Sequence, residues 1–302
     1  MAFTAKDVMA LREKTGAGMM DCKKALTDAD GNMEKAMELL RERGIAKAEK
    51  KASRIAAEGC VLGYVEGKSG VLVEVNCESD FVSSGPKFKA ICENVAKQIV
   101  KVQPATVEEL LASEYFEEAG KTVETYVKEQ VAIIGEKISI RRFVLKNSDN
   151  YMTTYMHLGG KMGVLLEVSA DEVTEAVKET AHDVTLQIAF SKPAYLAESD
   201  VPAEALEKEK AILKETAINS GKKPEIAEKM VMGGIKKFYS ENCLLNQAFI
   251  KDDKQTIAQI VKKAGSNMNV VSFDFFIMGE GLEKKQEDLS AEVAKQVEAM
   301  KK

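Results

Sequence analysis

The chain has few of the residues from which metal and disulfide sites are built. Its 302 residues include two histidines and five cysteines. An odd number of cysteines without a Cys-x-x-Cys spacing argues against a disulfide framework and against a zinc knuckle. His157 and His182 are too distant from each other in sequence, and from any cysteine pair, to indicate a metal site. We therefore expect no metal and no cofactor. We expect reduced, mostly buried thiols at Cys22, Cys60, Cys77, Cys92 and Cys243.

Long apolar runs and an excess of basic residues are also missing. No apolar stretch approaches the roughly 18 residues that span a bilayer, and the N-terminus lacks a basic segment followed by an apolar core, so no secretory signal is expected. The net charge is −5. Because phosphate binding draws on clustered lysine and arginine, this balance disfavours nucleic acid as the main ligand. We expect a cytoplasmic protein that contacts neither membrane nor nucleic acid directly and whose main partner is another protein.

What the chain does contain is an internal repeat. Gly70 to Val82 is an apolar strand that runs into a short acidic and aromatic tip, and Gly163 to Asp171 repeats the strand without the tip. Each copy precedes a helical segment that ends near a proline. The first copy is four residues longer between its strand glycine and its Gln-Ile pair, and the extra residues fall around 79–82. A feature found in only one copy of a duplicated unit indicates function more than scaffold.

Hydrophobic periodicity predicts an α+β protein. Residues 4–43 predict three short helices, the third with Asn32 as its N-cap and Gly44 as its end. Residues 45–57, rich in alanine and lysine, predict a solvated and partly helical linker. Beyond it, each half predicts a small antiparallel sheet with helices on one face. The expected strands are 61–65, 71–75, 137–145, 151–157, 164–168 and 270–278, and the expected helices are 88–100, 107–134 and one that ends at 190.

Two charged helical stretches, 203–219 and 225–239, interrupt the second copy. Each has one narrow apolar stripe, which predicts an inserted antiparallel helical hairpin. The predicted domains are an N-terminal module with its linker (1–55), a core N-subdomain (56–145), a core C-subdomain that carries the hairpin 203–239 (146–282) and a charged, solvated C-terminal tail (283–302).

Two long segments resemble the signatures of one known family. Leu11 to Leu26 is similar to the first signature of the bacterial elongation factor Ts family, and Glu74 to Ser83 is similar to the second. The similarity continues through 155–164 and 246–252. The family usually has threonine in place of Ser79 and a basic or amide residue in place of Ser84. The resemblance implies a ubiquitin-associated-like N-terminal module. It also implies a guanine-nucleotide exchange factor for the GTPase elongation factor Tu, without covalent chemistry of its own.

The tip residues Ser79, Asp80, Phe81 and Val82 are the leading candidate site. The pattern alone leaves two interpretations open. Phe81 could cap the local core while Asp80 caps a helix that begins near Pro86, or an exposed aromatic ring beside an acid could insert into a partner's pocket. The resemblance implies the second, because the matching family segment dislodges the magnesium ion from elongation factor Tu so that GDP leaves and GTP can rebind.

Secondary contacts are expected at the N-terminus and in the second copy. Two adjacent methionines, Met19 and Met20, cannot both point inward from one helix, and thioethers are common on binding surfaces. The resemblance implies that this region, with Leu11 and Lys23, grips the GTPase domain. A lone histidine at a hairpin turn is usually structural, but the resemblance implies that the segment with His157 and Gly159 touches another domain of elongation factor Tu. Glycines between antiparallel strands do not predict a phosphate loop.

Other interpretations remain open from the residues. An enzyme would need a nucleophile, for which Cys77 beside Asp80 is the best candidate, but both histidines are far away in sequence and Cys77 is expected to point into the sheet. Paired α+β units are also similar to RNA recognition domains, which makes an RNA-binding module of the translation apparatus the alternative function, although the strands lack interleaved aromatic and basic residues. A homodimer or a 2:2 complex formed through the C-subdomain is a further possibility.

Overall fold

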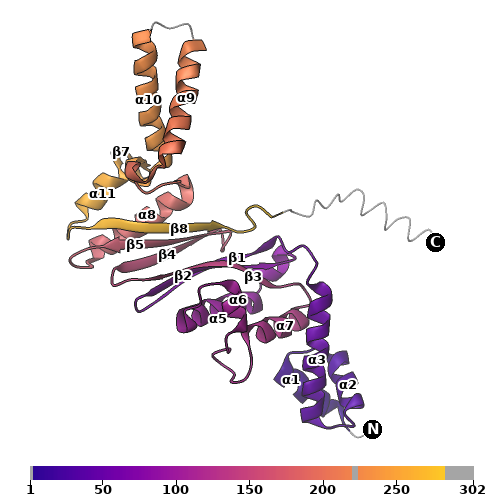
Figure 1. The fold of residues 1–302 in the computed structure, drawn as a ribbon. Coiled ribbons are helices and arrows are strands. Elements are labelled where there is room, and N and C mark those ends of the chain that lie inside the picture. The colour runs from indigo at the N-terminus through magenta and orange to yellow at the C-terminus, as the bar shows by residue number, and fades with distance from the viewer. Residues whose placement is uncertain (1–2, 220–223, 283–302) are drawn as a thin grey trace. The chain divides into compact units, whose positions relative to one another are not determined.

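The computed structural model describes residues 3–219 and 224–282 and has the predicted α+β architecture (Figure 1). Three N-terminal helices precede two three-stranded sheets, with strand orders β1-β2-β3 and β4-β5-β8. The helices are α1 (Ala5–Thr15), α2 (Met19–Asp28), α3 (Met33–Lys51), α4 (Asp80–Ser84), α5 (Pro86–Val102), α6 (Val107–Ala112), α7 (Val123–Ile134), α8 (Glu175–Ser191), α9 (Ala203–Asn219), α10 (Pro224–Asn242) and α11 (Ile257–Lys263). The strands are β1 (Glu58–Glu66), β2 (Ser69–Cys77), β3 (Ser139–Asn147), β4 (Tyr151–His157), β5 (Met162–Ser169), β6 (Ala248–Phe249), β7 (Asp252–Thr256) and β8 (Asn269–Ile277).

The described residues form two compact units. The first comprises 3–60, 74–142 and 278–282, and the second comprises 61–73, 143–219 and 224–277. The predicted domain boundaries at 55 and 145 stay predictions, and the predicted tail 283–302 lies outside the described residues. None of the described helices combines the length and the apolar character of a membrane-spanning helix. All five cysteines are buried, as predicted.

The third N-terminal helix differs from the prediction. Asn32 is its N-cap, since its side chain accepts a hydrogen bond from the amide of Lys35 at 3.0 Å. Gly44, however, does not end the helix, which continues to Lys51. A Cβ atom at Gly44 would lie 3.1 Å from the Cβ of Ala132 on α7, so this glycine permits close packing of two helices. The stretch 45–51 of the predicted linker is helical and mostly exposed, but it continues α3 and buries Ala48.

The helix predicted over 107–134 is two helices, α6 and α7. Thr106 and Thr122 each cap a helix N-terminus with a side-chain hydrogen bond, to the amides of Glu109 and Thr125. The segment between the helices forms a short β-bridge from Glu114 to Thr122. The threonine caps mark the two starts in the sequence, and the prediction missed them.

The duplication is visible in two buried glutamines. Gln98 on α5 donates from Nε2 to the carbonyl of Glu114 at 2.8 Å and accepts at Oε1 from the amide of Phe116 at 2.9 Å. On α8, Gln187 donates to the carbonyl of Ala248 at 3.2 Å and accepts from the amide of Ile250 at 2.9 Å. In both copies, one side-chain amide therefore satisfies the backbone of a short extended segment that would otherwise lack partners.

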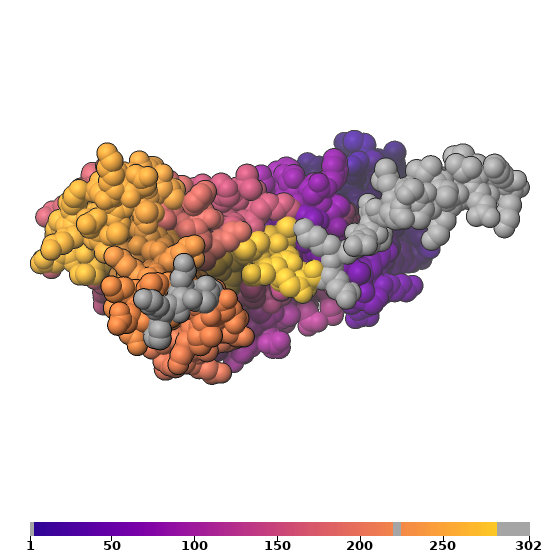
Figure 2. Space-filling model, turned by 90° about the horizontal axis from the view of Figure 1, so that it is seen from above, coloured from indigo at the N-terminus to yellow at the C-terminus, as the bar shows by residue number. Residues whose placement is uncertain are grey.

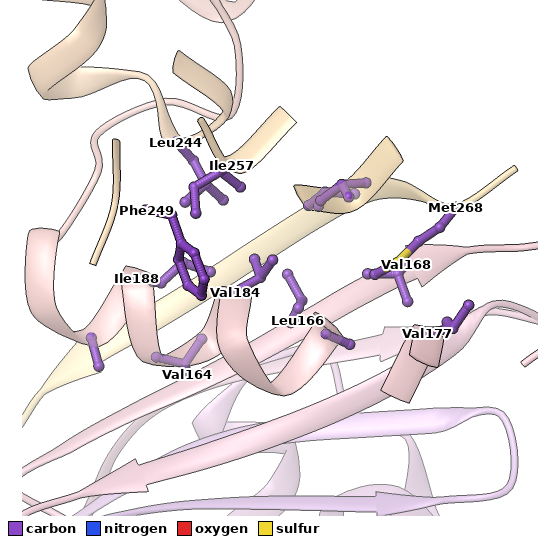
Figure 3. Packing of buried hydrophobic residues seen from close by; sticks show 14 of the residues in the cluster. Val164, Leu166, Val168, Val177, Val184, Ile188, Leu244, Phe249, Ile257 and Met268 are labelled. Carbon is purple, nitrogen blue, oxygen red and sulfur yellow. The ribbon is translucent and has the colours of Figure 1, made fainter. Parts of the chain in front are cut away.

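The second unit has an apolar core between β5, α8 and the segment that follows the hairpin. Figure 3 shows Val164, Leu166 and Val168 of β5 on one side of this core, with Val184 and Ile188 of α8 against them. Residues from 244–257 close the core from the other side, including Phe249 and Ile257. The alternate spacing on β5 and the i, i+4 spacing on α8 are the periods expected when a sheet packs on a helix.

Close packing also explains the glycine shared by the two repeat strands. A Cβ atom at Gly163 would lie 2.6 Å from Cγ1 of Val61 and 2.8 Å from Cδ1 of Leu72, and one at Gly70 would lie 2.9 Å from Sδ of Met152. These distances are shorter than real contacts of Cβ atoms. A larger residue at either position would force these neighbouring side chains to shift, so glycine favours the close approach seen here.

The predicted helical hairpin is confirmed as α9 and α10. Figure 2 views it end on, in orange, beside the gold surface of β7 and α11. The two helices meet closely at Gly234, where a Cβ atom would lie 2.5 Å from Cδ2 of Leu213.

Candidate functional site

The tip forms a short helix at the end of β2. Cys77 ends the strand, and α4 begins at Asp80. Ser79 is the N-cap of α4, because its Oγ accepts a hydrogen bond from the amide of Val82 at 3.3 Å. The interpretation in which Asp80 caps the helix near Pro86 does not hold, since the N-cap of α5 is Gly85 and has no side-chain cap bond.

The carboxylate of Glu136 holds the start of the tip. Its Oε1 accepts from Oγ of Ser79 at 2.6 Å, and its Oε2 accepts from the amides of Ser79 at 3.0 Å and Glu78 at 3.1 Å. Glu136 directly follows Gly135, the left-handed C-cap of α7. Hydrogen bonds to a charged acceptor are stronger than neutral ones, so three of them fix the backbone that leads into α4. Sequence reasoning missed Glu136, because no pattern around it connects it to residues nearly sixty positions earlier.

A second group of contacts braces Glu78, the residue before the tip. Its Oε1 accepts from the amide of Lys137 at 2.6 Å, and its Oε2 pairs with Nη1 of Arg54 at 3.2 Å. Nζ of Lys137 in turn donates to the carbonyl of Arg54 at 2.9 Å. Both carboxylate oxygens of Glu78 are thus bonded to other segments of the chain.

A buried glutamate anchors the strand that carries the tip. Glu74 on β2 is fully buried and accepts from Nη1 of Arg141 at 2.9 Å, Nε of Arg142 at 2.7 Å and the amide of Gly279 at 2.8 Å. Burial by itself raises the pKa of Glu74, but the hydrogen bonds from Gly279 and the two arginines outweigh it and hold the pKa below its ordinary value. The carboxylate is therefore ionised at neutral pH.

The tip presents an aromatic ring to solvent. Phe81 is 88% exposed and does not belong to the described core. Asp80 beside it is exposed, Val82 is partly buried, and Ser83 is buried. Of the two interpretations left open by the sequence, the structure excludes Phe81 as a cap on the local core.

The N-terminal candidates separate into one core residue and three surface residues. Leu11 is completely buried among α1 to α3, so the expectation that its side chain grips a partner is corrected: it holds the helices together. Met19 and Met20, at the start of α2, are both exposed, Met20 to 75%. Lys23 is exposed on the same helix. Their i, i+3 and i+4 spacing places these three side chains on adjacent positions of one helix surface.

The second-copy candidates lie at the β4–β5 turn. Nδ1 of His157 lies 3.0 Å from the hydroxyl of Tyr155, whose ring meets the ring of His182 edge-on. Gly159 is exposed and has a φ of 67°, a conformation that favours glycine. Next to it, Leu158 is 74% exposed, which the sequence reasoning did not anticipate.

The structure excludes Cys77 as an accessible nucleophile. Cys77 is fully buried, as the strand alternation predicted, and its thiol donates to the carbonyl of Ser79 at 3.2 Å. A substrate cannot reach a nucleophile in that position. Across the described ranges, 3–219 and 224–282, no three side chains of histidine, cysteine, aspartate or glutamate gather as a metal site would require.

Comparisons with known proteins agree on one family. The family model described as "Elongation factor TS" matches residues 78–280. The chain is 46% identical to elongation factor Ts of Clostridium botulinum (strain Alaska E43 / Type E3) over 302 residues, which cover 98% of this chain and 99% of the relative. It is 47% identical over 300 residues to the elongation factor Ts of Clostridium perfringens (strain 13 / Type A), covering 97% and 98% of the two chains. On these matches, spread over nearly its whole length, the chain belongs to the elongation factor Ts family of translation elongation factors.

Proposed function

We propose that this protein is a guanine-nucleotide exchange factor for the translational GTPase elongation factor Tu. It binds the GDP form of the GTPase and promotes GDP release by displacing the bound magnesium ion, after which GTP rebinds. The observation that carries the proposal is Phe81, an 88% exposed ring on α4, whose start is held by the hydrogen bonds of Glu136. Exchange of this kind needs protein contact and no covalent chemistry.

Because the start of α4 is held in place before binding, inserting the Phe81 ring into a partner costs less free energy. Ordering a loop during binding costs free energy, and a loop that is already ordered avoids this cost. Burying one large aromatic ring can dominate an interface. Magnesium demands near-ideal octahedral geometry, so a small displacement of the partner's metal-binding element weakens GDP. By linkage, a factor that binds the nucleotide-free GTPase more tightly weakens GDP in the same proportion.

The remaining contacts follow from exposure. Ser79 to Val82 form the displacing segment, in which the Ser79 hydroxyl makes its bonds to Glu136 with the same group that a threonine would offer. Met19, Met20 and Lys23 supply a second contact with the GTPase domain, and the turn with His157 and Gly159 supplies a contact with another domain. The protein acts in the cytoplasm, where translation takes place. A homodimer or a 2:2 complex through the second copy stays a prediction.

The RNA-binding alternative fits the sheets poorly. RNA recognition by a small sheet requires an open face on which bases stack against aromatic side chains. The central strands β2 and β5 have buried side chains in an unbroken run, on both faces. Neither central strand therefore presents a free face for stacking.

Stopped-flow release of a fluorescent GDP analogue tests the proposal. Saturating wild-type protein should accelerate release from elongation factor Tu. Phe81→Ala should reduce that acceleration about tenfold or more, as expected for an interface hot spot. Val271→Ala, which trims an exposed apolar residue on β8, should leave it unchanged. Release rates that do not respond to the wild-type protein would refute the exchange function, and full activity in Phe81→Ala would refute the role of the ring.

A further inference from the structure

Two large apolar side chains are exposed at one end of the second unit. Leu158, in the turn between β4 and β5, is 74% exposed, and Phe190, in the last turn of α8, is 75% exposed. Exposed apolar residues that occur singly are common on protein surfaces and indicate no site. Leu158 and Phe190 do not occur singly, because the sheet and the helix bring them to the same end of the unit.

The helix α8 runs along the sheet in the same direction as β4. Figure 3 shows Val177, near the start of α8, beside Val168 at one end of the core, and Ile188, near the end of α8, with Val164 at the other. In the antiparallel ladder, β4 begins opposite Val168 and continues past the partner of Val164. The C-terminal end of α8 therefore lies at the end of the sheet that carries the β4–β5 turn.

A ring contact aligns the strand with the helix. The rings of Tyr155 on β4 and His182 on α8 meet edge-on, with their centroids 5.7 Å apart. Leu158 is three residues beyond this contact, at most about 10 Å along the chain, and Phe190 is eight helical residues beyond it, about 12 Å and close to two turns. With His157, whose Nδ1 lies 3.0 Å from the Tyr155 hydroxyl, they form one surface, the β4–α8 surface: Tyr155, His157, Leu158, His182 and Phe190.

Leu158 departs from two local preferences at once. Its φ is 48°, in the left-handed region that glycine and asparagine adopt more readily, and its large apolar side chain is exposed to water. Neither feature stabilises the free protein. Natural chains depart from such preferences chiefly at functional sites, so a partner that covers this leucine accounts for it.

We infer that the β4–α8 surface binds an apolar patch on a domain of elongation factor Tu other than its GTPase domain, with Phe190 and Leu158 as the main contacts, an assignment that rests on the exchange function proposed above. The turn with His157 and Gly159 belongs to that proposed contact, and Phe190 extends it onto α8. A domain that does not hold the nucleotide offers the same contact before and after GDP leaves. Contact of equal strength with two states shifts neither of them. The surface therefore sets the affinity for the partner, whereas Phe81 sets the rate of GDP release in the complex.

The dependence of GDP release on factor concentration tests this division. Phe190→Ala should raise the concentration that gives half-maximal acceleration about tenfold or more, as expected for an interface hot spot, and should leave the maximal rate unchanged. Phe81→Ala should lower the maximal rate. Val271→Ala, at an exposed position of β8 on the opposite edge of the sheet, should change neither quantity. Calorimetric titration with elongation factor Tu should show the same loss of affinity for Phe190→Ala.

Leu158→Asn separates binding from folding. Asparagine suits the left-handed backbone and presents no apolar surface, so this variant should melt at the same temperature as the wild type or higher and yet bind elongation factor Tu more weakly. A leucine that served the fold alone would give the reverse. The melting temperature and the calorimetric affinity, measured on the same full-length variant, distinguish the two roles.

Three results would overturn the inference. They are an unchanged affinity in Phe190→Ala and Leu158→Asn, a lower maximal rate in Phe190→Ala at unchanged affinity, and a self-association of the free protein that Phe190→Ala abolishes, which would assign the surface to a second copy of the chain. Wild-type protein that binds elongation factor Tu without accelerating GDP release would refute the exchange function alone, because calorimetry still measures the contact. Wild-type protein that does not bind it would refute both.

Discussion

At the scale of single residues, the tip shows how an exposed aromatic side chain is positioned without being supported by a core. Phe81 has almost no contacts of its own, so its position is set by its neighbours in the chain. Ser79 caps α4 and binds Glu136, and the hydroxyl of Ser84 donates to the carbonyl of Asp80 at 2.8 Å. Local hydrogen bonds, and not packing in a core, therefore fix the backbone that carries the Phe81 ring.

Removing the negative charge of Glu136 should loosen the tip. In Glu136→Gln, the side-chain amide nitrogen replaces one of two oxygens that now accept three hydrogen bonds, so at least one donor at Glu78 or Ser79 loses its partner. Hydrogen bonds to charged groups contribute about 1.5–3 kcal/mol each. Amide hydrogen exchange at residues 78 and 79 should accelerate, and GDP release should slow although Phe81 is intact.

Glu124→Gln is the matched control for that variant. Glu124 lies on α7 and pairs with Lys128 at 3.0 Å on the surface, and an exposed helix pair contributes only about 0.3–0.5 kcal/mol. Its loss should leave amide exchange at the tip unchanged. If Glu136→Gln exchanged its tip amides as slowly as this control, the carboxylate would not be what holds the tip.

At the scale of elements, the sequence predicted which helices and strands exist better than where each of them begins and ends. The strands, the repeat and the helical hairpin follow from local periodicity, and β4 spans the same residues, 151–157, that were expected. The end of α3 could not be predicted, because Gly44 has the usual identity of a helix terminator and only its contact with Ala132 explains its place inside a helix. The hydrogen bonds of Glu136 to residues 78 and 79 could not be predicted either, since they join segments that only the fold brings together.

The adjacent glycines of α10 allow an element-scale prediction. A Cβ atom at Gly233 would meet nothing within 4 Å, whereas one at Gly234 would lie 2.5 Å from Leu213. Alanine is favoured over glycine inside a helix by about 1 kcal/mol. Gly233→Ala should therefore stabilise the hairpin by about that amount, and Gly234→Ala should gain less or destabilise it, because Leu213 must move.

The measurement is hydrogen exchange of the α9 and α10 amides in Gly233→Ala and Gly234→Ala, two variants of the same helix. The propensity gain is the same at both positions, so the difference between them measures the helix contact alone. Equal protection in the two variants would mean that Leu213 moves aside without cost.

At the scale of the whole molecule, the two halves repeat the same elements, and only the first carries the exposed tip at residues 79–82. In both halves a buried glutamine, Gln98 or Gln187, hydrogen-bonds the backbone of a short extended segment. The two halves therefore satisfy the same buried backbone groups in the same way. The tip adds residues between β2 and α5 and leaves the hydrogen bonds of Gln98 in place. The first half therefore accommodates the extra segment while it keeps these buried hydrogen bonds.

The N-terminal helices should matter for the tip as well as for binding. Within the first unit, Lys51 at the end of α3 donates to the carbonyl of Gly135, directly before Glu136. Removing residues 1–55 deletes this bond and exposes the face of α7 that carries Ala132. We expect the shortened protein to unfold at a lower denaturant concentration, to exchange its amides at 78 and 79 faster, and to bind elongation factor Tu more weakly.

Point variants separate the bond from the bulk effect of that deletion. Lys51→Met removes the bond to Gly135 and should accelerate amide exchange at the tip while most of the stability is retained, since one hydrogen bond from a charged group contributes at most about 1.5–3 kcal/mol. Lys50→Met, at an exposed neighbouring position of the same helix, is the control and should change neither property. If the deletion left the melting of the remaining chain and the exchange at residues 78 and 79 as they are in the full protein, α1 to α3 would be an independent grip, as the amino-acid pattern first indicated, and the coupling between α3, Gly135 and the tip would be refuted.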